Sequence, residues 1–214
     1  MRTHFDEQLS LLNKKMIEMG AFCEKLISVS CDALNSGDID MAKDVMKISE
    51  DADTMERSIE NLCLKLFLKE QPIASDLREI SAALKMITDM KRIADQAQDI
   101  AQIVVFLKGR KVEYRNIKEM AKAVIYMVNL SVDAYVRQDE DTAVKVIEYD
   151  DVVDEYFSKV KTDLIELIKN KNDDGEYFLD ILMIAKYLER IGDHAVNVAG
   201  WVMFSITGVH KDGD

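Results

Sequence analysis

Three oxygen-bearing side chains follow one another at intervals of four residues in the segment YLERIGDHAVN, residues 187–197. They are Glu189, Asp193 and Asn197. The segment has the apolar spacing of a helix, and residues four apart lie on one helix face, so the three side chains form a line. Carboxylate and amide oxygens suit hard or borderline ions such as Mg, Mn, Fe or Zn. We therefore predict that this line contributes to a metal site.

A second pair of carboxylates, Asp150 and Asp154, lies in the preceding helical segment. If the two segments form a hairpin with Asp154 level with Asp193, its midpoint falls inside the polar turn NKNDDGE. Like charges held this close raise one another's pKa or recruit a cation. Acidic pairs at this spacing are also common on solvated helix faces, which remains the alternative. The predicted second-half metal site comprises Asp150, Asp154, Glu189, Asp193 and Asn197.

A related but altered set occurs in the first half of the chain. Asp53 and Asp95 form the corresponding pair across a hairpin, and Asp99 follows on the same helix line. Lys91 replaces the glutamate of the second half, and Ser49 replaces its first aspartate. Because Lys91 can neutralise these carboxylates by a salt bridge, we predict a weaker or metal-free first site.

Other polar side chains lie close to these lines. His194 directly follows Asp193 and points off the carboxylate line, so it is expected to be a polar neighbour rather than a ligand. Arg92 and Arg190 recur in both halves. They either form structural ion pairs with the carboxylates or contact a partner or anion.

The sequence contains none of the motifs that commonly indicate a catalytic site in a helical protein. Di-iron bundle enzymes place Glu-x-x-His pairs on facing helices, but Gly192 stands three residues after Glu189. There is no Gly-rich phosphate loop and no Ser/His/Asp or Cys/His nucleophile set. We predict that the chain is not an enzyme, and a carboxylate-bridged metalloenzyme is the less favoured alternative.

The elements that must position these residues are helices. Apolar residues recur at helical spacing almost throughout, and Pro72 is the single proline. Gly37 and Asp38 stop the first helix and cap the second, and Ser75 or Asp76 can cap the third. Six helices are predicted: about 5–36, 38–69, 76–108, 114–137, 140–170 and 176–207.

The six helices divide into two related groups of three. A shift of 98 residues places 84–106 on 182–204 with eight identities, including Arg92 on Arg190 and Asp95 on Asp193. Upstream, a shift of 101 places Asp53 on Asp154. The predicted fold is all-α, with two tandem antiparallel three-helix bundles at residues 1–110 and 111–214.

The composition and charge of the chain restrict the classes of partner that it could bind. The 214 residues carry a formal net charge of −12 and no basic stripe, which argues against nucleic-acid binding and adhesion to anionic membranes. No apolar run has the length of a membrane span, and no signal segment begins the chain. Cys23, Cys31 and Cys63 show no metal-binding spacing, and free buried thiols in a reducing cytosol are expected.

Three segments together resemble the PhoU family of bacterial phosphate-signalling regulators. They are LERIGDHAVN (188–197), MKRIADQAQD (90–99) and QPIASDLR (71–78), and the resemblance covers the whole chain. It implies two tandem three-helix bundles in a cytoplasmic, often dimeric protein. Some members hold multinuclear metal clusters on paired E/D-x-x-x-D motifs, which match Asp150/Asp154 and Glu189/Asp193 here. Only Asp53 and Asp95 match in the first half, where Ala94 also replaces the family's glycine.

The resemblance also implies a function. Members act as negative regulators of the phosphate-starvation response, linking the ATPase subunit of the phosphate ABC transporter to a sensor histidine kinase. A homodimeric regulatory adaptor without turnover is therefore expected, with Fe, Zn or Mn, or alternatively Mg, at the carboxylates. A purely structural helical module with solvated acidic faces is the remaining alternative.

Overall fold

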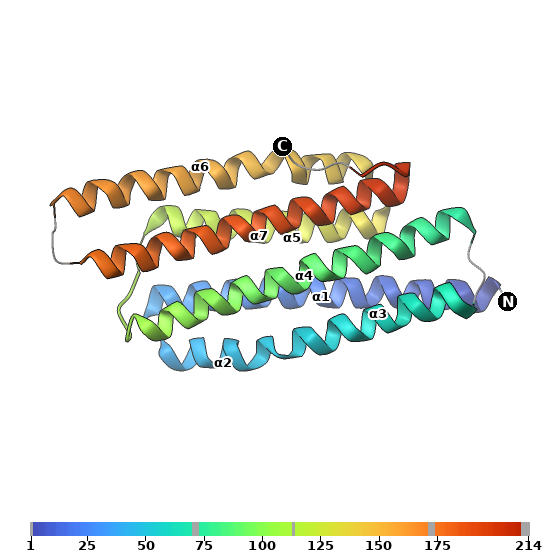
Figure 1. The fold of residues 1–214 in the computed structure, drawn as a ribbon, viewed down its shortest axis with the longest axis horizontal. Coiled ribbons are helices and arrows are strands. Elements are labelled where there is room, and N and C mark those ends of the chain that lie inside the picture. Colours follow the sequence, from blue (N-terminus) through green and yellow to red (C-terminus); the bar gives the residue numbers. More distant parts are fainter. Residues whose placement is uncertain (1, 70–72, 113, 171–173, 211–214) are drawn as a thin grey trace.

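All regular structure in the described part of the chain is helical. The computed structural model describes residues 2–69, 73–112, 114–170 and 174–210. Long helices joined by a loop run in opposite directions along the long axis of the molecule, so the first and third helical segments of each half are parallel (Figure 1). Their bounds are α1 Arg2–Ser36, α2 Ile39–Ser49, α3 Asp51–Lys69, α4 Ala74–Phe106, α5 Arg115–Arg137, α6 Glu140–Asn170 and α7 Gly175–Thr207.

The predicted second helix is divided into α2 and α3 by a break at Glu50. The Ser49 hydroxyl donates to the carbonyl of Met46 at 2.7 Å, a local bond that competes with the helical ladder. The Glu50 N–H bonds to the carbonyl of Ile48. The backbone of Glu50 keeps right-handed helical angles, so α2 and α3 together form the predicted second helix with one local interruption, and the remaining helices agree with their predicted ranges to within a few residues.

The turns explain where these helices begin. Gly37 has a φ of +71°, and the Asp38 carboxylate accepts from the backbone N–H groups of Asp40 and Met41 at 3.0 and 2.9 Å. This confirms the predicted cap of the second helix. The cap of α4 is Ile73, not Ser75 or Asp76; Asp76 lies one turn inside and accepts from the Ile73 N–H at 3.1 Å. Pro72 lies outside the described residues.

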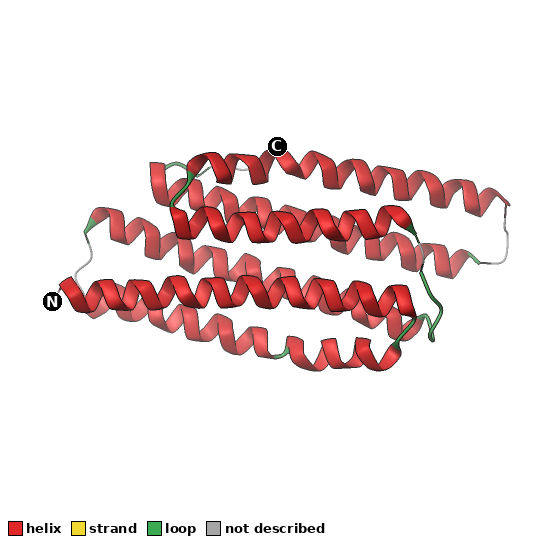
Figure 2. Ribbon diagram, turned by 180° about the vertical axis from the view of Figure 1, so that it is seen from behind, coloured by secondary structure: helices red, strands yellow, loops and turns green. Residues whose placement is uncertain are grey.

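The helices form two groups that lie side by side, and α4 of one group packs against α7 of the other where the groups meet. One group contains α1, α2, α3 and α4, and the other contains α5, α6 and α7, as both views show (Figures 1 and 2). α4 packs on α7 more extensively than on any other helix, and α1 also contacts α5. The halves therefore share an extended interface, and the predicted boundary at 110/111 falls in the connection between α4 and α5.

A continuous apolar core passes through both halves. It includes fully buried Met16, Ile87, Val124 and Ile184, which come from four different helices. The three cysteines are free and buried, as predicted, and burial raises the pKa of each thiol to about 12. Among the described residues, no helix combines the length and apolarity that crossing a membrane requires.

Candidate metal centre

The α6–α7 hairpin brings the four predicted carboxylates of the second half together. Burial is the main cause that raises the pKa of Asp150 to about 7, and the charges of Asp154, Asp193 and Glu189 raise it further. Burial and then Glu189 also raise the pKa values of Asp154 and Asp193. The charges of these carboxylates therefore act on one another's neighbours across the α6–α7 pair, and a metal ion shared among the four remains a prediction.

Asp150 has a buried carboxylate oxygen at the α6–α7 contact. Its Oδ1 atom is buried and has no hydrogen-bond partner among the described residues. The carboxylate lies against the backbone of Gly192, where a Cβ atom would come within 2.9 Å of Asp150 Oδ1. A buried carboxylate oxygen without a donor is unfavourable, because burial removes its hydration. Asp150 therefore offers an oxygen that a proton or a cation would stabilise.

Lys186 neutralises part of the cluster in the described arrangement. Its Nζ atom lies 2.5 Å from both carboxylate oxygens of Glu189, one turn away on α7. Within the described ranges, no three His, Cys, Asp or Glu side chains are arranged so that they could hold a metal ion. Shared coordination therefore requires side-chain rotation, with Glu189 released from Lys186. The contact of Lys186 was not predicted from the sequence, although a lysine three residues before Glu189 has the spacing of an ion pair on a helix.

Asn197 and His194 are directed toward the first half of the molecule. The Asn197 amide donates to Asp89 Oδ1 at 3.2 Å, and His194 Nδ1 lies 3.0 Å from the same oxygen. Asp89 belongs to α4, so these contacts cross the interface between the halves. This corrects the prediction that Asn197 joins the α6 carboxylates. His194 is a polar neighbour of the cluster, as expected.

The first-half carboxylates are held by Lys91. Its Nζ atom lies 2.7 and 2.9 Å from the two oxygens of Asp95, and 3.3 Å from Asp53. The predicted salt bridge is therefore confirmed. Glu56 joins this group, since burial, Glu60 and Asp53 raise its pKa while Lys91 lowers it. No motif indicated Glu56, because the equivalent residue of the second half is Phe157.

The remaining predicted residues lie around these two groups. Burial and then Asp95 raise the pKa of Asp99, while Arg190 lowers it, so Arg190 of α7 acts on a carboxylate of α4. Arg92 Nη1 lies 3.6 Å from Asp95 Oδ2, with a largely exposed side chain. Both arginines thus have a structural role as neighbours of carboxylates, and their contact with a partner remains a prediction.

Comparison with known proteins identifies the family. The family model described as "PhoU domain" matches the chain twice, over residues 16–104 and 117–202. The chain belongs to the PhoU family. Each match lies within one of the two predicted units, so the repeat recognised within the sequence coincides with the repeated family domain.

Relatives of the PhoU family match nearly the whole chain. A protein of Clostridium acetobutylicum named "Phosphate-specific transport system accessory protein PhoU homolog" is 34% identical, covering 99% of this chain and 98% of its own. The crystal structure of PhoU from Pseudomonas aeruginosa has a TM-score of 0.89 and 30% identity, covering 96% of this chain and 100% of that one. PhoU from Streptococcus pneumoniae, at 24% identity and a TM-score of 0.90, shows the same fold.

The two halves of this PhoU family member have side chains of different size at the position of Gly192 and at the residues packed against it. In the second half, a Cβ at Gly192 would contact Asp150 and, at 3.4 Å, Val153. The equivalent positions of the first half are Ala94, Ser49 and Ala52, all buried. The smaller residues of the α2–α3 segment thus leave room for the methyl group of Ala94. The absence of the family glycine in the first half is therefore compatible with the same packing.

The contact between position 192 and the Asp150 carboxylate can be tested by substitution. Gly192→Ala gains about 1 kcal/mol of helix propensity, but the methyl group must displace the Asp150 carboxylate. We expect a net change in the free energy of unfolding below about 0.5 kcal/mol. In the Asp150→Ser background, which copies the first-half serine, Gly192→Ala is expected to gain about 1 kcal/mol in urea unfolding near pH 4, where the Asp150 charge carries no penalty. An equal effect of Gly192→Ala in the wild-type and Asp150→Ser backgrounds would contradict the proposed contact.

Proposed function

We propose that this chain is a regulatory accessory protein of a phosphate-specific transport system. The observation that carries the proposal is full-length similarity to the Clostridium acetobutylicum accessory protein, which extends over 98% of that relative. The phosphate transport system regulatory protein PhoU of Streptococcus pneumoniae has the same fold over 97% of this chain. Function on this account depends on binding and not on turnover.

The proposed mechanism is negative regulation by exchange of partners in the cytoplasm. The chain, as a homodimer, contacts the ATPase subunit of the phosphate ABC transporter and a sensor histidine kinase. A change in the transporter's state shifts which partner is bound, and this represses the starvation response when phosphate is abundant. The net charge of −12 is complementary to basic patches on the surfaces of the proposed partners.

The proposal includes a metal ion at the second-half carboxylates. Asp150, Asp154, Glu189 and Asp193 would hold it, since Asp150 offers a buried oxygen without a donor, and burial followed by the charges of the other three carboxylates raises the pKa of Asp150. Their oxygens suit Fe, Zn, Mn or Mg. The bound ion would supply positive charge that joins α6 to α7. The first-half carboxylates do not fit a metal in the same way, because Lys91 already provides their countercharge.

A deletion strain tests the regulatory proposal. Loss of the chain is expected to keep a phosphate-starvation reporter active at high phosphate, and expression of the wild-type chain should repress it again. The tagged chain should also co-purify with the transporter ATPase and the kinase in a phosphate-dependent manner. An unchanged reporter together with no co-purification at any phosphate level would rule out the proposal.

A further inference from the structure

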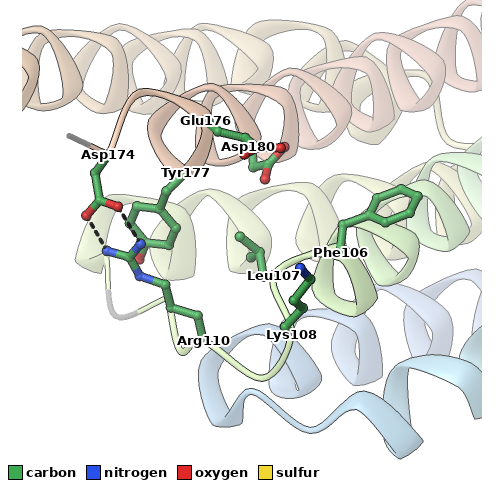
Figure 3. Close-up of a pocket in the computed structure, with 8 residues that line it drawn as sticks. All are labelled: Phe106, Leu107, Lys108, Arg110, Asp174, Glu176, Tyr177 and Asp180. Atoms are coloured by element: carbon green, nitrogen blue, oxygen red, sulfur yellow. Dashed lines mark hydrogen bonds and ion pairs between the residues drawn. The ribbon is translucent and has the colours of Figure 1, made fainter. Parts of the chain in front are cut away.

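A cavity of about 450 Å³ opens where the α4–α5 connection meets the start of α7. Figure 3 shows its lining side chains, with Phe106 and Lys108 on one side and the first turns of α7 above. Arg110 is fixed at its edge by two hydrogen bonds to Asp174, at 2.9 and 2.7 Å. The Arg110 guanidinium also stacks on Tyr177, 3.4 Å from the ring centroid. The edge of the cavity is therefore already organised.

The wall formed by α7 is acidic. Glu176 and Asp180 both line the cavity, and burial together with the charge of Glu176 raises the pKa of Asp180. Within the described residues, neither carboxylate forms an ion pair, even with Lys108 in the same cavity. The C-terminal end of α4 also lies here, and the last carbonyls of a helix favour a cation. The cavity thus offers negative charge that the chain does not fully neutralise.

The internal repeat shows what fills the equivalent place at the other end of the molecule. There, Arg78 of α4 donates from Nε to the carbonyl of Ser205 at 3.5 Å, and its side chain lies beside Gly208 at the end of α7. The residue equivalent to Arg78 is Glu176, and the residues equivalent to Ser205 and Gly208 are Leu107 and Arg110. At one end a guanidinium from the first turns of one helix therefore reaches across to the end of the other helix, whereas at the cavity end that position is the carboxylate Glu176, and Arg110 is bonded to Asp174 at the edge.

Exposed apolar side chains occur in the cavity lining, at Phe106, and on the same face of α7 as the two lining carboxylates. Leu179 is 61% exposed, Met183 is 44% exposed, and Phe106 is 63% exposed. Residues 176, 179, 180 and 183 have the i, i+3, i+4, i+7 spacing of a single helix face, so the two apolar side chains flank the two carboxylates. The equivalents of Leu179 and Met183 in the first half are Ser81 and Lys85. These two apolar side chains are therefore specific to this end of the molecule.

We propose that this cavity binds an arginine side chain from a partner protein, presented in a helical segment between large apolar residues. The guanidinium enters beside Glu176 and Asp180, so the partner brings to this end the positive charge that Arg78 of the chain itself supplies at the other end. The flanking apolar residues cover Phe106 on one side and Leu179 and Met183 on the other. The surface is distinct from the carboxylate cluster, since Asp180 and Asp193 are about 20 Å apart along α7.

Synthetic helical peptides test this surface without knowledge of the natural partner. The probe carries one arginine flanked one turn away on each side by leucine; in the matched probe citrulline replaces arginine. Binding is measured by calorimetry at low salt. Citrulline is expected to weaken binding at least about tenfold, the effect of losing one well-placed charge pair. Glu176→Gln/Asp180→Asn should weaken the arginine probe similarly and make the two probes nearly equal.

Variants remote from the cavity test whether peptide binding depends on this site or only on the net charge and the overall hydrophobicity of the surface. Asp40→Asn/Asp133→Asn changes the net charge equally at exposed positions and should leave binding unchanged. Leu179→Ser/Met183→Ser should weaken binding at least about fivefold, whereas exposed Leu64→Ser/Leu68→Ser should not. No binding, or equal binding by both probes to wild type, would overturn the proposal. Loss of self-association in Leu179→Ser/Met183→Ser, without an effect on peptide binding, would instead identify a second copy as the occupant.

Discussion

Lys91→Glu is expected to lower the free energy of unfolding by about 2–4 kcal/mol in metal-free buffer at pH 8. The variant removes the cation that bonds Asp95 and lies 3.3 Å from Asp53, and it adds a third negative charge beside them. The Lys91 and Asp95 side chains are each about three-quarters buried, at 24% and 27% exposure, so water compensates only in part. For a chain of this size the loss corresponds to a fall in Tm of roughly 5–15 °C.

A surface lysine provides the matched control. Lys43→Glu makes the same change of charge at a pair in which both side chains are largely exposed, and it should cost below about 1 kcal/mol. The two variants are compared by thermal melting with chelator present. In an Asp193→Ala background, Mn, Fe or Zn should restore part of the Tm of Lys91→Glu, because a cation replaces the lost ammonium. Equal Tm values for Lys91→Glu and Lys43→Glu would show that Lys91 does not support the first half.

Asp150→Asn is expected to stabilise the metal-free protein at pH 8 by about 2 kcal/mol, after allowance for partial solvent exposure. The pKa of Asp150 is raised from 3.8 to about 7 on folding, mainly by burial. The folded state therefore binds the proton more tightly than the unfolded state does. Stability of the wild type consequently falls as pH rises from about 4 to about 7, and the penalty is fully present above that range. The neutral amide of asparagine avoids the penalty.

Urea unfolding across pH 4 to 8 in the presence of chelator measures this effect. The gain from Asp150→Asn should be close to zero near pH 4 and should increase to its full value near pH 7. Exposed Asp40→Asn should show no such dependence, since its side chain is 95% exposed. A gain that stays constant with pH would mean that the Asp150 carboxylate titrates normally in the folded chain.

Much of this arrangement was predictable because it depends on local spacing and on the repeat. The i, i+4 spacing of carboxylates and the position of a polar turn fixed the register of the α6–α7 hairpin. Comparison of the halves identified Lys91 as the countercharge of Asp53 and Asp95, and the structure confirms that contact. These predictions need only helical periodicity and one antiparallel pairing.

Features that depend on long-range packing or on a single local bond were not predictable. Asn197 contacts Asp89 because α7 crosses α4, and no spacing within either helix specifies that crossing. The interruption at Glu50 could not be read from Ser49, because Ser131 and Ser205 form the same hydroxyl-to-carbonyl bond three residues back within the continuous helices α5 and α7. The open cavity beside Glu176 depends on where the α4–α5 connection runs, and this became visible only with both halves in place.

The metal content of freshly purified protein tests the central claim most directly, namely that the second-half carboxylates hold an ion and the first-half carboxylates do not. Elemental analysis should be made on wild type, Asp193→Ala and Asp95→Ala, before and after reconstitution with Fe, Mn and Zn. We expect metal in wild type and in Asp95→Ala, and its loss in Asp193→Ala. Metal-free wild type after reconstitution, or metal that persists in Asp193→Ala, would contradict it.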